Sequence, residues 1–258
     1  MTGKLIDRRS VLKASATLVG LGLAGCDAVG ESSNGQAILR SVEPVNRRLH
    51  TLLGRSALAV QFNDGDLSPE FRANGTLDPA TPDYQKLAER NFADWHLNVT
   101  GLVHKPVQLS LADLRQLPAR TQITRHDCVE GWSCIGKWTG ARLGALLTQL
   151  SVQRSARYIV FHCADLLPSG GLSAPEPYYE SIDLDDAFHE QTILAYEMNG
   201  RALPVAHGAP LRLRVERQLG YKHAKYVMGI EVVDSYEKFG RGRGSYWADN
   251  GYSWYAGI

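Results

Sequence analysis

The stretch RHDCVEGWSCIGKWTG, residues 125–140, holds two of the chain's four cysteines, Cys128 and Cys134. The segment before it, ARTQITR, is typical of a strand, so Cys128 is expected at a strand end, where its sulfur can face a pocket. Arg125 and His126 beside it would favour the thiolate, which is both a nucleophile and a soft-metal ligand. These residues alone leave open a disulfide between the two cysteines and a metal-ligand role for Cys128.

Two other cysteine chemistries have less support in the sequence. A zinc site built from Cys128, Cys134, Cys163 and a histidine would need a C-x5-C spacing followed by a long gap, which matches no common zinc pattern. A cysteine hydrolase would need a histidine and an Asn or Asp brought close in space, and no local signature indicates one.

The charge balance of the chain argues against nucleic acid as its main partner. The 258 residues include 28 basic and 27 acidic side chains, a formal charge of +1, whereas phosphate binding needs a basic excess or a dense basic patch. One basic cluster, KFGRGRG at 238–244, is either a solvated loop or an anion-binding segment.

The N-terminal segment, residues 1–26, has the composition of an export signal. Basic residues precede an apolar run that is shorter than the roughly 20 residues needed to span a bilayer. DRRSVLK resembles the twin-arginine export motif, with Asp7 where that motif usually has Ser or Thr. LAGC resembles a bacterial lipobox, which would make Cys26 a lipidated residue in the periplasm. An ordinary signal peptide that contains a cysteine is the other interpretation. Residues 27–45 are expected to form a polar tether and residues 46–258 the functional domain.

The rest of the pattern is mixed, with strands dominating and no strict βαβ alternation. It predicts an α+β fold with a largely non-parallel sheet system. Residues 41–94 are rich in loop signals. Strands are expected at 94–103, 156–165, 210–217 and 225–236, and before the Asn-Gly turn at 199–200. Helices are expected at 109–118 with Ser110 as cap, at 139–150, and at 183–189 with Asp183 as cap.

A second polar region, LPVAHGAPLRLRVERQLGYKHAKYV at 203–227, concentrates cations and histidines. Arg212 lies on an otherwise apolar strand, and a buried cation there would need an anionic partner. GYKHAK offers backbone N–H groups and cations at close quarters, which suits a phosphate or a polar heterocycle. A surface loop with solvated lysines is the other interpretation.

Taken together, these motifs resemble the sulfite-oxidase-type molybdopterin oxidoreductases over roughly residues 60–258. RHDCVEGWSCIGKWTGARLGALL looks like that family's molybdenum-ligand motif, which implies that Cys128 supplies the protein thiolate to the metal. The resemblance implies further cofactor contacts from Arg72 and Asn74 in FRANGT, Asp165 or Cys163 in FHCAD, His207 and Arg212 in HGAPLR, and Lys222, His223, Ala224 and Lys225 in GYKHAK.

The same resemblance implies a fold and an activity. The fold would be the sulfite-oxidase-type molybdopterin-binding fold, with mixed β-sheets and short helices. The chain is similar to the compact exported bacterial branch, which includes methionine-sulfoxide reductase catalytic subunits. Its activity would be oxygen-atom transfer to or from a small sulfite-like or S-oxide substrate. By its spacing from His223, Tyr246 is the candidate for the family's active-site tyrosine, and a structural aromatic in the C-terminal cap GYSWYAGI is the other interpretation. Arg241 or Arg243 could bind an anionic substrate.

Electrons would pass to or from a separate cytochrome or membrane haem protein, because no C-x-x-C-H haem motif occurs in the chain. The rival interpretation is a non-catalytic exported lipoprotein that retains the fold as a binding module.

Overall fold

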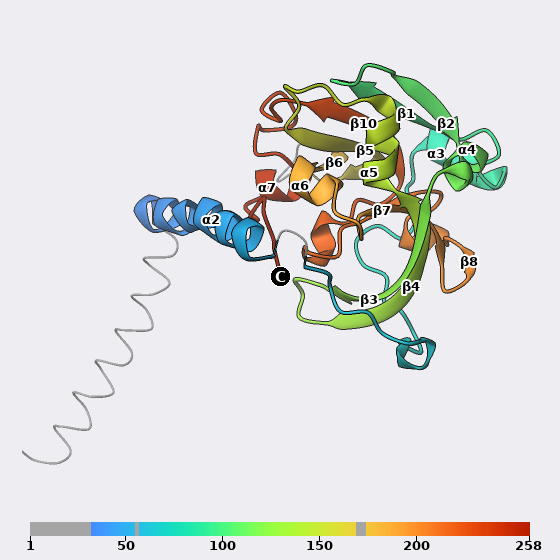
Figure 1. Ribbon diagram of the computed structural model, residues 1–258, viewed down its shortest axis with the longest axis horizontal. Coiled ribbons are helices and arrows are strands. Elements are labelled where there is room, and N and C mark those ends of the chain that lie inside the picture. The colour runs from blue at the N-terminus through green and yellow to red at the C-terminus, as the bar shows by residue number, and fades with distance from the viewer. Residues whose placement is uncertain (1–31, 55–56, 169–173) are drawn as a thin grey trace, which may run out of the picture. The chain divides into compact units, whose positions relative to one another are not determined.

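A computed structural model describes residues 32–54, 57–168 and 174–258 (Figure 1). The chain divides into two compact units, residues 1–49 and 50–258, and the second unit contains both sheets. The expected export signal, Cys26 and residues 27–31 lie outside the described residues. No helix in the described ranges is long and apolar enough to cross a membrane.

The segment expected to be a tether and a loop is helical over much of its length. Helix α2 runs from Ser33 to Gly54 despite Pro44 in its interior. Apolar residues recur at three- and four-residue steps from Ile38 to Leu52, which is the period of an amphipathic helix. The sequence prediction did not include this period. Residues 57–94 are mostly irregular, as expected, apart from the 3-10 turn η1 (Asp64–Asp66) and helix α3 (Pro82–Glu89).

The first sheet has the strand order β2-β1-β10-β5-β6. Its β1 and β10 strands are parallel, and its other pairs are antiparallel. The strands span His96–Gly101 (β1), Val107–Ser110 (β2), Tyr158–Leu167 (β5), Glu176–Asp183 (β6) and Val227–Val233 (β10).

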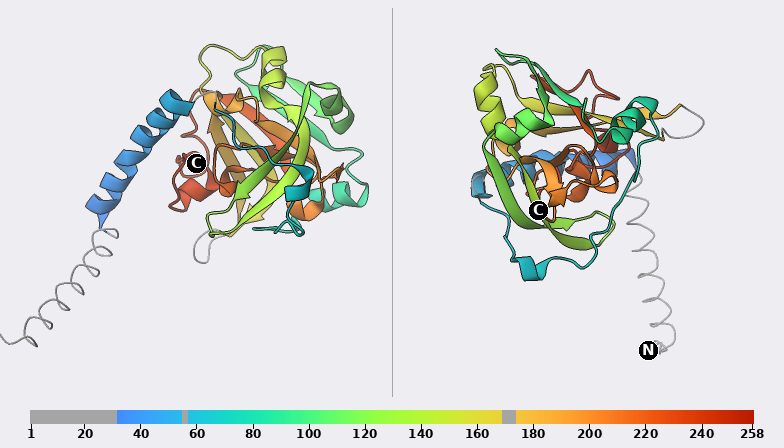
Figure 2. Two further views of the ribbon diagram at one scale, coloured as in Figure 1. Left: turned by 60° about the horizontal axis from the view of Figure 1, so that its bottom comes forward. Right: turned by 90° about the vertical axis from the view of Figure 1, so that its right-hand side faces the viewer.

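The second sheet has the order β3-β4-β7-β8, with β9 also paired to β7, and all its pairs are antiparallel. The long β3–β4 hairpin curves along one side of this unit (Figures 1 and 2). The strands span Ala119–Asp127 (β3), Ser133–Arg142 (β4), Ile193–Met198 (β7), Arg201–Ala202 (β8) and Arg212–Arg214 (β9).

The short helices fall close to the expected positions. Ser110 caps α4 (Leu111–Gln116) and Asp183 caps α6 (Leu184–Ala187). Each side chain accepts a hydrogen bond from the backbone N–H of the residue three positions later. The helix expected at 139–150 begins later, since α5 spans Leu143–Leu150. Residues 139–142 belong to β4, which is paired on both sides, and this pairing overrides the local helical pattern. The remaining elements are η2 (Val205–His207), η3 (Gly220–Lys222) and α7 (Tyr246–Asp249).

The main hydrophobic core lies where the two sheets meet α5. Leu143, Leu146, Leu147 and Leu150 of this helix are all buried, and they belong to one cluster with residues of β1, β5, β10, β7 and β9. The helix therefore fixes the two sheets against each other, and the ends of β3, β5 and β9 are held together near one cavity. The α+β class with mixed sheets and short helices is confirmed.

A buried ion pair anchors η3 to the first sheet. The Lys222 ammonium group donates to the Glu180 carboxylate and to the Ser181 carbonyl oxygen, the latter at 2.8 Å, and it lies over the Trp254 ring. Both charged side chains are fully buried. Burial raises the pKa of Glu180 to about 7, an effect that the neighbouring Lys222 opposes.

We predict that Lys222→Met destabilises the protein by about 3–5 kcal/mol, because it leaves the Glu180 carboxylate buried without its cation. Chemical denaturation of the variant measures this loss. Adding Glu180→Gln to Lys222→Met should restore part of the stability. A Lys222→Met variant as stable as the parent would contradict the structural role of the pair.

Candidate active site

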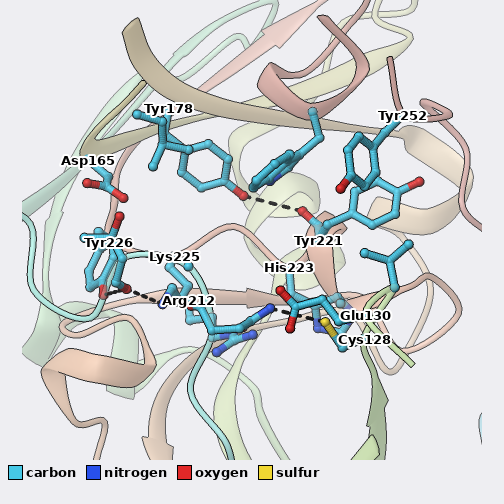
Figure 3. Close-up of a pocket in the computed structure, with 17 residues that line it drawn as sticks. Cys128, Glu130, Asp165, Tyr178, Arg212, Tyr221, His223, Lys225, Tyr226 and Tyr252 are labelled. Atoms are coloured by element: carbon cyan, nitrogen blue, oxygen red, sulfur yellow. Dashed lines mark hydrogen bonds between the residues drawn. The ribbon is translucent and has the colours of Figure 1, made fainter. Parts of the chain in front are cut away.

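A cavity of about 160 Å³ lies between the end of the β3–β4 hairpin, the end of β5 and the segment around η3. Figure 3 shows Cys128, His223 and Arg212 along one wall and tyrosines along the facing wall, with Lys225 and Asp165 towards one end. The lining residues are Asn74, Gly75, Thr76, Cys128, Val129, Glu130, Asp165, Leu167, Tyr178, Arg212, Gly220, Tyr221, His223, Lys225, Tyr226, Trp247 and Tyr252.

Cys128 is held at the tight turn that closes the β3–β4 hairpin. Its backbone N–H donates to the Trp132 carbonyl at 2.9 Å, and its carbonyl accepts from the Gly131 N–H at 3.0 Å. The Asn74 side-chain amide donates to its sulfur at 3.4 Å. Burial raises the pKa of the Cys128 thiol, while hydrogen bonds from Glu130 and Asn74 favour the thiolate. Cys128, Cys134 and Cys163 are free thiols, so the structure does not contain the disulfide that the sequence left open.

Arg212 brings a buried positive charge to the cavity wall. It is 3% exposed, and one guanidinium nitrogen donates to the His207 carbonyl at 3.0 Å. Its Nε is buried, and the described residues offer it no hydrogen-bond partner. Burial lowers the pKa of Arg212 to about 9. A buried arginine with an unsatisfied Nε is suited to an anionic ligand.

Lys225 supplies a second cation near Arg212. Its ammonium group donates to the carbonyl oxygens of Asn74 (2.8 Å), Thr76 (2.6 Å) and Ala206 (3.2 Å). Burial first and Arg212 second lower its pKa to about 7. In the part of the chain that the structure describes, neither cation forms a salt bridge with a carboxylate. Asp165 also lines the cavity and favours the charged form of Lys225, so the protein compensates this positive charge only in part.

A buried network behind Arg212 is a feature that the sequence interpretation missed. Arg214 donates two hydrogen bonds to the Glu216 carboxylate, at 2.8 and 2.6 Å, and a third nitrogen lies 2.9 Å from His126 Nδ1. Its guanidinium also stacks over the Trp138 ring, 4.4 Å from the centroid. The alternation in RLRVER, which begins in β9 and continues into the following turn, could have indicated that Arg212, Arg214 and Glu216 share one face.

The histidines around the cavity are uncharged near neutral pH. Burial lowers the pKa of His207 to about 4, and it lowers the pKa values of His126 and His223 well below the ordinary value, with Arg214 adding to the effect in both. His223 Nε2 lies 3.0 Å from the Gln218 carbonyl oxygen. The described residues supply no hydrogen-bond partner for Nδ1 of His207, Nδ1 of His223 or Nε2 of His126. Neutral imidazoles with unused nitrogens suit a polar heterocycle.

The structure brings six of the expected cofactor contacts to the cavity: Asn74, Cys128, Asp165, Arg212, His223 and Lys225. It does not bring the side chain of Lys222, which is paired with Glu180, and buried Ala224 is not a lining residue. Arg72 is exposed and stacks on Trp132. Cys163 and His207 are not lining residues.

The two residues expected to contact the substrate also lie outside the lining. The Tyr246 hydroxyl donates to the Pro168 carbonyl at 2.5 Å, and Arg243 is exposed. The glycine-rich loop at 240–244 does form an anion-binding turn, but its anion is the protein's own Asp249. The backbone N–H groups of Arg241 and Arg243 donate to that carboxylate at 2.9 and 3.2 Å.

An aromatic wall takes the place that the sequence interpretation gave to Tyr246. Tyr178, Tyr221 and Tyr252 line the cavity opposite Cys128 (Figure 3), and Trp247 also lines it. Trp247 and Tyr252 are 5.2 Å apart between ring centroids, as are Tyr221 and Tyr252. Glu130 also lines the cavity and accepts from the Trp132 indole at 2.8 Å. The aromatic-rich C-terminal segment of the sequence was the only signal for this wall.

Comparison with known proteins identifies the family of the chain and the cofactor of that family. The family model described as oxidoreductase molybdopterin binding domain matches residues 84–239. The chain belongs to this family of molybdopterin-dependent oxidoreductases. The match includes Cys128, Asp165, Arg212, His223 and Lys225.

Curated relatives cover most of the chain. It is 35% identical to a putative protein-methionine-sulfoxide reductase subunit YedZ1 of Azospira oryzae, over 99% of this chain and 90% of the relative. It is 32% identical to the protein-methionine-sulfoxide reductase catalytic subunit MsrP of Xanthomonas campestris pv. campestris, over 88% of this chain and 70% of that protein. A solved structure, the sulfane dehydrogenase SoxCD of Paracoccus pantotrophus, matches 60% of this chain and 44% of that chain with a TM-score of 0.47 and 22% identity.

The residues of the cavity fit a molybdopterin. Its phosphate and sulfur groups are anionic, and Arg212 and Lys225 provide buried cations that form no salt bridge with a carboxylate among the described residues. Its heterocycle carries donors and acceptors that the unused nitrogens of Arg212, His207 and His223 can meet. The Cys128 sulfur is a soft ligand suited to molybdenum.

We predict that Arg212→Ala lowers retention of the molybdenum cofactor by about 30-fold or more, because losing one partner of a buried charged contact costs about 2–5 kcal/mol. Elemental analysis of the purified variant measures molybdenum per chain. Arg243→Ala removes an equal side chain from the surface and should keep the parent's metal content. Equal loss in both variants would remove the assignment of Arg212 to the cofactor.

The lowered pKa of Lys225 predicts a pH-dependent stability for the cofactor-free protein. Above its folded-state pKa of about 7 the buried amine is neutral, whereas in the unfolded chain it stays protonated up to its ordinary value of 10.5. The unfolded state therefore binds more protons in this window, and stability rises with pH by at most about 1.4 kcal/mol per unit.

The measurement is the difference in free energy of unfolding between the cofactor-free parent and Lys225→Met, taken by urea titration at pH 7, 8 and 9. We expect the parent to gain on the variant at each step. A difference that stays constant from pH 7 to 9 would show that Lys225 is not destabilised as a cation.

Proposed function

We propose that this enzyme reduces S-oxides, with methionine sulfoxide as the representative substrate, in an exported form that takes electrons from a separate redox protein. The observation that carries the proposal is the cavity itself, where the Cys128 sulfur faces an aromatic wall across a space bordered by buried cations. Two relatives that cover most of the chain are named as subunits of protein-methionine-sulfoxide reductases, which supports this direction of oxygen transfer.

The overall reaction joins an S-oxide, two electrons and two protons to give a thioether and water. When bound, the molybdenum cofactor supplies the oxygen-atom acceptor and the two-electron redox change. The chain binds this group and orients it: Cys128 would ligate the metal, and Arg212, Lys225 and His223 would hold the pterin and its phosphate.

The polar groups at Cys128 tune the sulfur that would bind the metal. The Asn74 amide, 3.4 Å from this sulfur, favours its thiolate form, which metal binding requires. The tight turn from Cys128 to Trp132 fixes the position of the sulfur through two backbone hydrogen bonds.

The aromatic wall would form the substrate side of the cavity. Tyr178, Trp247 and Tyr252 present ring surfaces, and thioether and sulfoxide sulfur contacts with aromatic rings are favourable by about 0.3–1.5 kcal/mol. A half-enclosed aromatic surface also limits water near the reacting sulfur. The wall therefore suits an apolar S-oxide side chain better than a small inorganic anion.

The redox partner and the cellular site are part of the proposal. A haem attachment motif of the C-x-x-C-H type is absent from the sequence, so an external cytochrome or membrane haem protein would supply electrons. The twin-arginine-like signal at residues 1–26 and its lipobox support a periplasmic, lipid-anchored protein.

A substrate panel with an artificial electron mediator tests the proposal in both directions. Methionine sulfoxide and other S-oxides should be reduced with kcat/KM values well above those for N-oxides, and sulfite should not be oxidised at a comparable rate. Sulfite oxidation as the faster reaction would overturn the proposed direction. A purified protein without molybdenum would favour a binding module that keeps the fold.

Replacement of the metal-ligand cysteine provides a sharper test of the site. We predict that Cys128→Ser loses S-oxide reduction by more than the roughly 10–100-fold that loss of an outer contact to a metal site costs. Cys134→Ser is the matched control, because this buried thiol belongs to the hairpin core and does not line the cavity. Retained activity in Cys128→Ser would remove Cys128 as the ligand.

A further inference from the structure

The N-terminal helix α2 presents a continuous apolar stripe to solvent. Ile38, Val42, Val45, Leu49 and Leu52 are each between 49% and 79% exposed. At about 100° per residue these five side chains fall within an arc of about 80°, which is one narrow face of the helix. Five of the thirteen large exposed apolar side chains in the described ranges lie on this one helix, so they form a patch and are not scattered.

The polar residues of α2 give the helix a positive charge. Its sequence contains three arginines and one glutamate, a net charge of +2, whereas the whole chain carries +1. Arg47 and Arg48 lie outside the apolar arc. An amphipathic helix with aliphatic residues on one face and arginines on the other matches the surface of an anionic bilayer, where apolar side chains enter the acyl region and cations meet the headgroups.

The chain leading into α2 keeps the helix near the membrane if Cys26 is lipidated. Six residues, 27–32, separate Cys26 from Ser33. Even fully extended, this connection reaches only about 25 Å. The first turn of α2 would therefore stay within reach of the headgroups, and its apolar face would meet a lipid surface far more often than any dissolved partner.

We propose that α2 is an interfacial membrane-binding helix that lies on an anionic lipid surface through Ile38, Val42, Val45, Leu49 and Leu52. The helix adds a second attachment beside the expected lipid at Cys26 and holds the start of the catalytic unit at the membrane, where a membrane haem protein could be met. The inference does not depend on the reaction that the cavity carries out.

Vesicle co-sedimentation of residues 27–258 tests the proposal without the export signal or the lipidated cysteine. This segment contains every helix and strand that the structure describes. We expect it to bind vesicles that contain phosphatidylglycerol, to bind pure phosphatidylcholine vesicles more weakly, and to release as salt is raised, because ions screen the arginines. Failure to bind phosphatidylglycerol vesicles at low salt would overturn the proposal.

A pair of matched variants locates the binding surface. Val45→Gln with Leu49→Gln removes apolar side chains from the stripe without changing charge and should weaken vesicle binding at least about 10-fold. Ala37→Gln with Asn46→Gln places the same side chain outside the arc and should bind like the parent. Equal binding by all three proteins would overturn the role of the stripe.

Two further readouts separate lipid from other occupants of the stripe. The Val45→Gln, Leu49→Gln variant should keep the parent's thermal stability and elution volume. A lower melting temperature without vesicles would mean that the stripe packs on the protein's own catalytic unit, and a parent dimer that becomes a monomer in the variant would mean that the stripe binds a second copy. Either result contradicts membrane binding as the role of this face.

Discussion

The buried positive charge of Arg212 and Lys225, which the protein compensates only in part, is the constraint on which the site depends. Both cations are buried, and the described residues give neither a carboxylate partner. Burying charge in this way is unfavourable unless an anion arrives from outside the chain. The depressed pKa values of both groups express the same strain, and an anionic cofactor relieves it. Binding of the cofactor and completion of the fold around it are therefore linked.

Other buried cations close to Arg212 and Lys225 in the sequence are paired with carboxylates of the protein. Arg214 is also fully buried, yet it makes a two-point contact with Glu216, and Lys222 is paired with Glu180. These internal pairs hold β9 and η3 in place and need no ligand. The chain thus separates cations that build the cavity from cations that face it, although all four lie between residues 212 and 225.

The sequence predicted those features of the fold that depend on contacts between residues close together in the chain. Ser110 and Asp183 cap short helices because their side chains reach a backbone N–H three residues ahead. The start of α5 could not be predicted in this way, since Arg142 and the residues before it belong to a strand paired on both edges. The sequence did not predict helix α2, because polar and loop-forming residues in this segment obscure the three- and four-residue period of its apolar residues.

The sequence predicts which residue types form the site, but it does not predict which way each side chain points. The cysteine at the hairpin end was identifiable, because a strand end presents its side chain to a pocket. GYKHAK, by contrast, does not tell which lysine faces the cavity, and Lys222 turns to Glu180 while Lys225 does not. The sequence likewise does not tell that the Tyr246 hydroxyl donates to a backbone carbonyl and that Tyr246 does not line the cavity.

Molybdenum K-edge X-ray absorption of the purified enzyme tests the central claim most directly, because it counts sulfur ligands whatever the substrate. A dithiolene gives two sulfur ligands and Cys128 would give a third. We predict three in the parent and in Cys134→Ser, and two in Cys128→Ser. Three sulfur ligands in Cys128→Ser, or two in the parent, would contradict the assignment of Cys128 as the residue that binds the metal.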